Sequence, residues 1–168
     1  MSKKEKITII GAGAIGSSLA TKMSNAGYDI TMIVRKMSDP EMECVTLSLL
    51  EDDHEISQEV KIAEEIKNDP DFVIITVKNQ DLKEVIKTHL SQLLKTKVIL
   101  IQNGVNARNI AEEFLDKKEI ISLIVLYNCV LLDKFKVEMS NRKAIIFSRQ
   151  CHSFKLLEEI FLESNINY

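Results

Sequence analysis

The sequence predicts an α/β protein built on a doubly wound, Rossmann-type sheet, mostly parallel, with late antiparallel strands. Three observations lead to this fold class. A glycine-rich turn near the N-terminus separates a β-branched run from a helical pattern. Apolar strand-like runs then alternate with amphipathic stretches as far as residue 115, which is typical of parallel sheets with crossover helices. Beyond residue 118 short strand-like runs follow one another, and we expect one more sheet strand and then antiparallel additions.

The glycine-rich turn begins after residues 7–10 (ITII), a run suited to a strand buried on both faces. The next glycines, Gly11, Gly13 and Gly16, have the spacing G-x-G-x-x-G. Gly11 permits a tight turn, Gly13 lets a pyrophosphate approach the backbone, and Gly16 lets helix and strand pack closely. The pattern therefore predicts a dinucleotide site, and the alternative is a glycine-rich turn with a structural role alone.

A helical pattern starts at Ala14 and ends at Gly27, which we expect to be a left-handed cap. The first amides of a helix have no partner within it and carry partial positive charge, so they favour phosphates. We therefore include Ala14 and Ile15 with the three glycines in the predicted cofactor-binding set.

The second strand, residues 30–34, ends at Arg35 and Lys36. In dinucleotide-binding folds an acid at this point binds the ribose 2′-hydroxyl of NAD, whereas a basic residue accommodates the 2′-phosphate of NADP. Asp39 and Glu41 follow too late to replace that acid. Arg35 therefore predicts NADP(H) as the cofactor, and the alternative is that both cations are solvated loop charges.

Residues 43–62 contain two runs with a period of two around the polar residues 51–55, which predicts a hairpin with a solvated tip. We expect residues 63–68 to form a helical turn before Pro70.

Two further strand and helix units follow. Residues 71–77 and 98–101 predict buried strands, and the helix after the first of them could be capped by Asp81. Its inner side is predicted to carry Leu82, Val85, Ile86, Leu90, Leu93 and Leu94. A second helix is expected over residues 106–115.

Lys78 and Asn103 lie where these two strands end. Ligands of doubly wound sheets bind at the carboxyl ends of the strands, so both residues are candidates to face one site. The last part of the chain predicts strands over residues 120–126, 130–132, 135–139 and 144–147, and an amphipathic helix over residues 154–163 with Phe154, Leu157, Ile160 and Phe161 inward.

Composition narrows the function classes. The chain has 168 residues, of which 45% are hydrophobic and 28% charged, as in a globular domain. Its formal charge of −3 argues against nucleic acid or an anionic membrane as the main partner. No apolar run reaches the length of about 18 residues that a membrane helix needs. Three cysteines without C-x-x-C spacing fit reduced thiols in the cytoplasm, and three scattered histidines predict no metal site.

Four motifs in order carry a family resemblance: GAGAIGS at residues 11–17, Arg35, TVKNQD around Lys78 and IQNG around Asn103. Together they resemble the N-terminal domain of ketopantoate reductase (2-dehydropantoate 2-reductase). Members of that family reduce a 2-keto acid with NADPH in pantothenate biosynthesis. The resemblance implies that the glycines hold the pyrophosphate and Arg35 the 2′-phosphate. It also implies that Lys78, Asn103 and the neighbouring Gly104 lie at the nicotinamide and substrate, with Lys78 and Asn103 as catalytic candidates.

The sequence departs from the family in two ways. Residues 137–142 contain no glycine where the family has a glycine-containing tract, which affects the expected late hairpin. The family's proton-donating lysine belongs to a C-terminal helical domain, which would begin soon after Tyr168. We therefore expect residues 1–168 to be a single dinucleotide-binding domain without that substrate domain. Such a chain is expected to bind NADPH and to turn over slowly or not at all, because a positioned proton donor contributes roughly 10²- to 10⁴-fold.

Two other functions fit the same residues. One is an NADP-binding or sensing module without turnover, and the other is the Rossmann half of another dehydrogenase of the 6-phosphogluconate-dehydrogenase-like group. Apolar surface where a second domain would dock could also make the chain a homo-oligomer.

Overall fold

The parallel centre of the sheet is built from apolar runs early in the chain. The computed structural model describes residues 4–37, 39, 41–67, 69–103, 106–126, 128–140, 145–147 and 154–168. Its strands are β1 (Lys6–Ile10), β2 (Asp29–Ile33), β3 (Cys44–Glu51), β4 (His54–Ala63), β5 (Phe72–Ile75), β6 (Lys97–Leu100), β7 (Ile120–Val125), β8 (Asn128–Asp133), β9 (Lys136–Ser140) and β10 (Ile145–Phe147).

These strands form one sheet in the order β10-β7-β6-β5-β1-β2-β4-β3-β9-β8. The run from β7 to β4 is parallel throughout. Antiparallel pairs join β3 to β4, β8 to β9 and β10 to β7. The predicted class, a mostly parallel doubly wound sheet with late antiparallel strands, is thereby confirmed.

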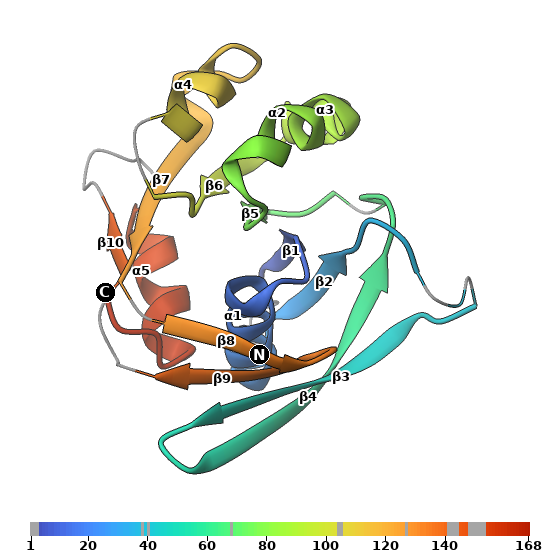
Figure 1. Cartoon of the computed structure of the whole chain (residues 1–168). Helices are drawn as coiled ribbons and strands as arrows, with labels where there is room; N and C mark the ends of the chain where they lie inside the picture. The colour runs from blue at the N-terminus through green and yellow to red at the C-terminus, as the bar shows by residue number, and fades with distance from the viewer. Residues whose placement is uncertain are drawn as a thin grey trace.

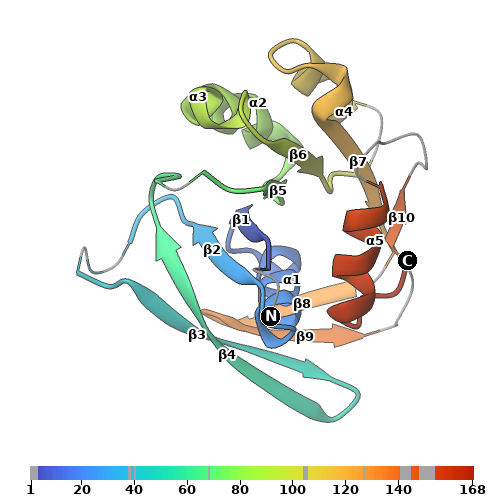
Figure 2. The ribbon, with the colours of Figure 1, turned by 180° about the vertical axis from the view of Figure 1, so that it is seen from behind.

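The helices are α1 (Ala14–Asn25), α2 (Asn79–Thr88), α3 (Leu90–Leu93), α4 (Asn106–Glu112) and α5 (Phe154–Glu163), with a 3₁₀ turn, η1, at Lys117–Glu119. Figures 1 and 2 show α1 and α5 on one face of the sheet and α2, α3 and α4 on the other. The predicted helix over residues 154–163 is confirmed, with Leu157, Ile160 and Phe161 buried; the Phe154 side chain lies outside the described residues.

Alternation along the central strands gives each face its own core. Ile7 and Ile9 of β1 pack with Leu19 and Met23 of α1, whereas Ile10 faces the opposite core with Leu82 of α2. Because both faces are covered, the strands read as continuous apolar runs in the sequence.

The hairpin β3–β4 takes the place that a crossover helix would have between β2 and the next parallel strand. It turns at Asp52 and Asp53, both with positive φ, as the predicted polar tip requires. β9 then pairs in parallel with β3, and β8 forms the outer edge. As a result α1 is enclosed by the central strands, the hairpin and β8–β9 (Figure 1).

Three local predictions were wrong. Residues 63–67 form no helical turn: Ala63 is still the last residue of β4, and the chain then bends at Glu64 and Glu65. The backbone NH of Met37 donates to Glu64 Oε1 and Ile66 is buried, so both ends of this bend are held against the fold. Asp81 does not cap α2: the cap position is Lys78, and Asp81 lies in the first turn. Leu94 is 61% exposed, because the helix breaks at His89 and its register changes.

The helical cap at Gly27 is confirmed. Its φ is +89°, its NH donates to the Ser24 carbonyl, and the NH of Tyr28 donates to the Met23 carbonyl. This is a Schellman motif, which satisfies the last carbonyls of α1.

Candidate functional site: a nucleotide edge

The glycine loop joins β1 to α1 at the carboxyl edge of the sheet. Gly11 has φ +115°, and a Cβ there would lie 2.7 Å from the Thr76 hydroxyl. A Cβ on Gly16 would overlap the carbonyl oxygen of Gly11. Both positions therefore require glycine for reasons internal to the fold.

Gly13 differs from the other two glycines. A Cβ at this position would meet no atom within 4 Å, and its φ of −80° is open to any residue. Gly13 also precedes the first turn of α1, where the amides that include those of Ala14 and Ile15 begin the helix. A glycine with no need inside the fold is what close approach of a ligand would require, so the loop fits a pyrophosphate.

The strand ends along this edge are held together by side chains. The Thr76 hydroxyl lies 3.1 Å and 3.0 Å from the carbonyl oxygens of Ile10 and Gly11. Gln102 Nε2 donates to the carbonyls of Ile75 and Val77 at 3.0 Å and 2.9 Å. The ends of β1, β5 and β6 are thus fixed relative to one another.

Asn103 extends this series to β7. Its Oδ1 accepts from the NH of Val125 at 3.3 Å, and its Nδ2 donates to the Val125 carbonyl at 3.5 Å. Both contacts are long for hydrogen bonds between amides, so the side chain is held weakly. Asn103 remains on the exposed side of the edge.

Lys78 and Asn103 line one pocket of about 290 Å³ together with Ile15, Thr76 and Gln102. The structure therefore brings together both catalytic candidates and one residue of the helix start. Gly104 lies outside the described residues.

Arg35 lines a second pocket, of about 550 Å³, which also includes Gly11 and Ala12 of the glycine loop. Its walls include the apolar side chains of Ile33, Val77 and Val85, and its rim includes Asp81. The guanidinium of Arg35 is 85% exposed, and its Nη2 lies 3.6 Å from Asp81 Oδ1. A pocket with apolar side chains, an exposed cation and the glycine loop in its lining fits the adenosine part of a dinucleotide.

His89, which is buried between α2 and α3, also lines this second pocket. Burial lowers the pKa of its imidazole, and the nearby Glu65 carboxylate opposes that shift. The imidazole is therefore neutral near pH 7 and adds no positive charge beside Arg35.

Thr76, Gln102 and Asp81 were not among the predicted site residues. Thr76 and Asp81 stand within TVKNQD and Gln102 within IQNG, so their place after a buried strand was a usable signal. Thr76 and Gln102 contact backbone carbonyls of neighbouring strands, and Asp81 pairs with Arg35. The periodicity of the sequence does not reveal such contacts between distant segments.

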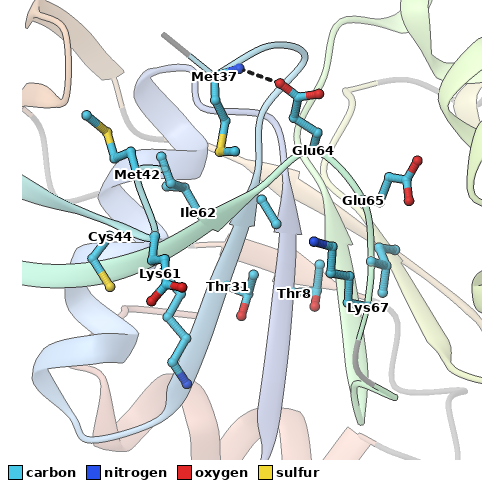
Figure 3. Close-up of a pocket in the computed structure, with 13 residues that line it drawn as sticks. Thr8, Thr31, Met37, Met42, Cys44, Lys61, Ile62, Glu64, Glu65 and Lys67 are labelled. Atoms are coloured by element: carbon cyan, nitrogen blue, oxygen red, sulfur yellow. Dashed lines mark hydrogen bonds between the residues drawn. The ribbon is translucent and has the colours of Figure 1, made fainter. Parts of the chain in front are cut away.

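A third pocket, of about 690 Å³, lies away from the predicted residues. Its floor is Thr8 of β1 and Thr31 of β2, and its rim carries Met37, Lys61 and Glu64 (Figure 3). None of the predicted cofactor or catalytic residues lines it. It occurs where the hairpin replaces a crossover helix and leaves this face of the sheet open.

Among the residues that the structure describes, no group of three or more His, Cys, Asp or Glu side chains is placed to hold a metal ion. Within the same ranges, no helix has both the length and the apolar composition needed to span a bilayer.

Comparisons with known proteins add a family to this geometry. The model of the family described as ketopantoate reductase PanE/ApbA matches residues 7–150. The chain is 34% identical over 105 residues to the 2-dehydropantoate 2-reductase of Mesorhizobium japonicum, covering 60% of this chain and 32% of that protein. It spans about a third of the length of the curated relatives it matches.

Solved structures share the fold. A PanE/ApbA family ketopantoate reductase from Ralstonia eutropha JMP134 has a TM-score of 0.83 at 20% identity, over 96% of this chain and 55% of that one. D-mandelate dehydrogenase in a ternary structure with NADH and anilino(oxo)acetate has a TM-score of 0.80 at 20% identity, with the same coverage. These similarities extend the fold match beyond the glycine loop to nearly the whole chain.

Proposed function

The chain belongs to the ketopantoate reductase PanE/ApbA family, and on that premise we propose that it is the NADP(H)-binding part of a 2-dehydropantoate 2-reductase-like oxidoreductase of pantothenate biosynthesis. The observation that carries the proposal is the glycine loop. Gly11 and Gly16 are required by the fold, whereas Gly13 leaves open space at the start of α1. That space is where a pyrophosphate would meet the helix amides.

The other residues have separate roles in the proposal. Arg35 would bind the 2′-phosphate at the mouth of its pocket, and Lys78 and Asn103 would line the nicotinamide and substrate side. Bound NADPH would supply the hydride, which adds to the keto carbon while the oxygen gains negative charge. The ammonium of Lys78 would stabilise that charge, and a donor must then protonate the oxygen.

We propose that the proton donor belongs to the part of the family's length that this chain does not span. Support comes from length, because the chain covers about a third of its curated relatives. The proposal also gives the protein a 2-keto acid as its partner and a cytoplasmic location, which the free thiols of Cys44 and Cys129 support.

A second candidate function is an NADP-binding module without turnover. Such a module needs only the glycine loop and the pocket that Arg35 lines, and the described residues contain both. NADPH oxidation with 2-dehydropantoate and a panel of other 2-keto acids separates the two functions. Any substrate-dependent oxidation supports the oxidoreductase, and tight NADPH binding with no oxidation supports the module.

The first test is calorimetric titration of NADPH, NADH and ATP into the protein. Arg35→Ala should weaken NADPH by about 1.5 to 3 kcal/mol and leave NADH nearly unchanged, because a charge-assisted contact to the 2′-phosphate is lost. Lys61→Ala, which removes an exposed cation from the hairpin, is the matched control. Equal loss for both nucleotides would show that Arg35 does not contact the 2′-phosphate.

A further inference from the structure

Arg35 already has an anionic partner. Its Nη2 lies 3.6 Å from Asp81 Oδ1, and the Asp81 side chain is 29% exposed against 85% for Arg35. Asp81 stands in the first turn of α2, where the helix dipole stabilises a negative charge. The carboxylate is therefore the better anchored member of the pair, and it draws the guanidinium toward α2.

The pocket around this pair carries more negative than positive charge. Glu64, Asp81 and Glu84 all belong to its described lining, and Arg35 is the cation among those residues. His89 adds no compensating charge near pH 7, because burial lowers the pKa of its imidazole. A dianionic phosphate entering here would meet Arg35 and a carboxylate together.

We propose that Asp81 is a specificity-determining residue that holds Arg35 and so reduces the preference for NADPH over NADH. The proposal rests on the proposed function, in which the adenosine ribose lies beside Arg35. To bind the 2′-phosphate, Arg35 must give up part of its interaction with Asp81. The 2′-hydroxyl of NADH has no such competition and can donate a hydrogen bond to the Asp81 carboxylate.

The deciding variant is Asp81→Asn, which keeps the shape of the side chain and removes its charge. NADPH should bind about twofold to fivefold more tightly, in line with the strength of an exposed ion pair. NADH should bind equally or more weakly, and the NADPH gain should shrink as salt is raised. Calorimetry at low and high ionic strength gives the affinities for NADPH and NADH and their dependence on salt. A thermal melt reports whether the variant folds.

The matched control is Glu113→Gln. Glu113, directly after α4, pairs with Lys83 of α2, so this variant changes the net charge equally and lies outside the pocket. It should leave the NADPH to NADH ratio of affinities unchanged. An equal gain in the control would mean that net charge alone is responsible and would overturn the proposal.

A double variant tests whether Asp81 acts through Arg35. In the Arg35→Ala background, Asp81→Asn should produce less of the NADPH gain, and an undiminished gain would contradict the proposal. The outcomes also distinguish the proposed nucleotide binding from the role of Asp81. A wild-type protein that binds no nicotinamide nucleotide would overturn both proposals. A wild-type protein that binds NADPH, with an unchanged ratio in Asp81→Asn, would overturn only the role of Asp81.

Discussion

Gly13 and Gly16 differ in what a side chain would encounter. Open space surrounds the Cβ position of Gly13, so Gly13→Val should fold with a loss of no more than about 1 kcal/mol from the weaker helix cap. The same variant should lose NADPH binding, because the branched side chain occupies the approach to the α1 amides. Calorimetry and urea unfolding measure the two effects separately.

Gly16→Val is the natural comparison. Its Cβ would overlap the Gly11 carbonyl oxygen, so the loop and α1 must move apart and the protein should unfold at lower temperature. If Gly13→Val also unfolded, the glycine loop would be explained by structure alone.

Lys22 and Glu51 form a buried ion pair. Lys22 Nζ lies 3.0 Å and 2.8 Å from the two Glu51 carboxylate oxygens, and it also donates to the carbonyl of Asn165 at 3.1 Å. The side chains are 8% and 7% exposed. This pair connects the glycine-loop helix to β3 and to the segment after α5.

Removing one member of the pair should be costly. Glu51→Gln is expected to lower the free energy of unfolding by about 3 kcal/mol, because a buried ammonium is left without its counter-ion. Asp29→Asn, which breaks an exposed pair with Lys61 at 2.8 Å, should cost less than about 1 kcal/mol. Urea unfolding compares the two, and similar losses would show that burial of the Lys22 pair contributes little.

The junction between α2 and α3 introduces a pH dependence through His89. Its pKa is lowered by burial, so below its ordinary value of 6.5 the unfolded chain binds the proton more readily than the folded one. The stability contribution is therefore complete above that value and is lost as pH falls through the lowered pKa. His89→Gln should flatten the decline in unfolding free energy between pH 7.5 and 5, and an unchanged slope would exclude His89 as its source.

Elements with a strong local signal were predictable, and their ends were not. The runs that became β1, β5 and β6 are apolar on both faces, so the sequence identified them directly. The course of residues 63–67 depends on the hydrogen bond from the Met37 backbone NH to Glu64, which comes from a segment distant in the sequence. The break at His89, where the imidazole is buried, left no signal in the helical pattern. The same holds for the Arg35–Asp81 pair, which joins two elements separated by the hairpin.

The edge strand β8 leaves apolar side chains on the surface of the molecule. Val130 is 55% exposed and Leu132 49%, and Ile124 and Leu126 lie exposed just before them. An edge with unpaired backbone groups and apolar side chains favours association. We therefore expect the protein to self-associate through this edge at micromolar concentration.

Sedimentation velocity checks this expectation. Val130→Lys combined with Leu132→Lys should shift the protein toward monomer, because two charges on one edge oppose pairing. Leu94→Lys changes a residue that is 61% exposed on another surface and should have no effect. A monomer in the wild type would remove β8 as an association surface.

The enclosure of α1 has a consequence for the order of folding. β9 pairs with β3 in the register Leu49 to Val137, so this contact closes a loop of about half the chain. Closing such a loop costs conformational entropy before the new contacts stabilise the structure, so non-local pairings of this kind form slowly. The residues proposed to bind the nucleotide lie within residues 11–103 and can assemble first, whereas β9, which helps to enclose α1, comes from later in the chain. During synthesis on the ribosome, α1 therefore stays uncovered on one side until residue 139 has emerged.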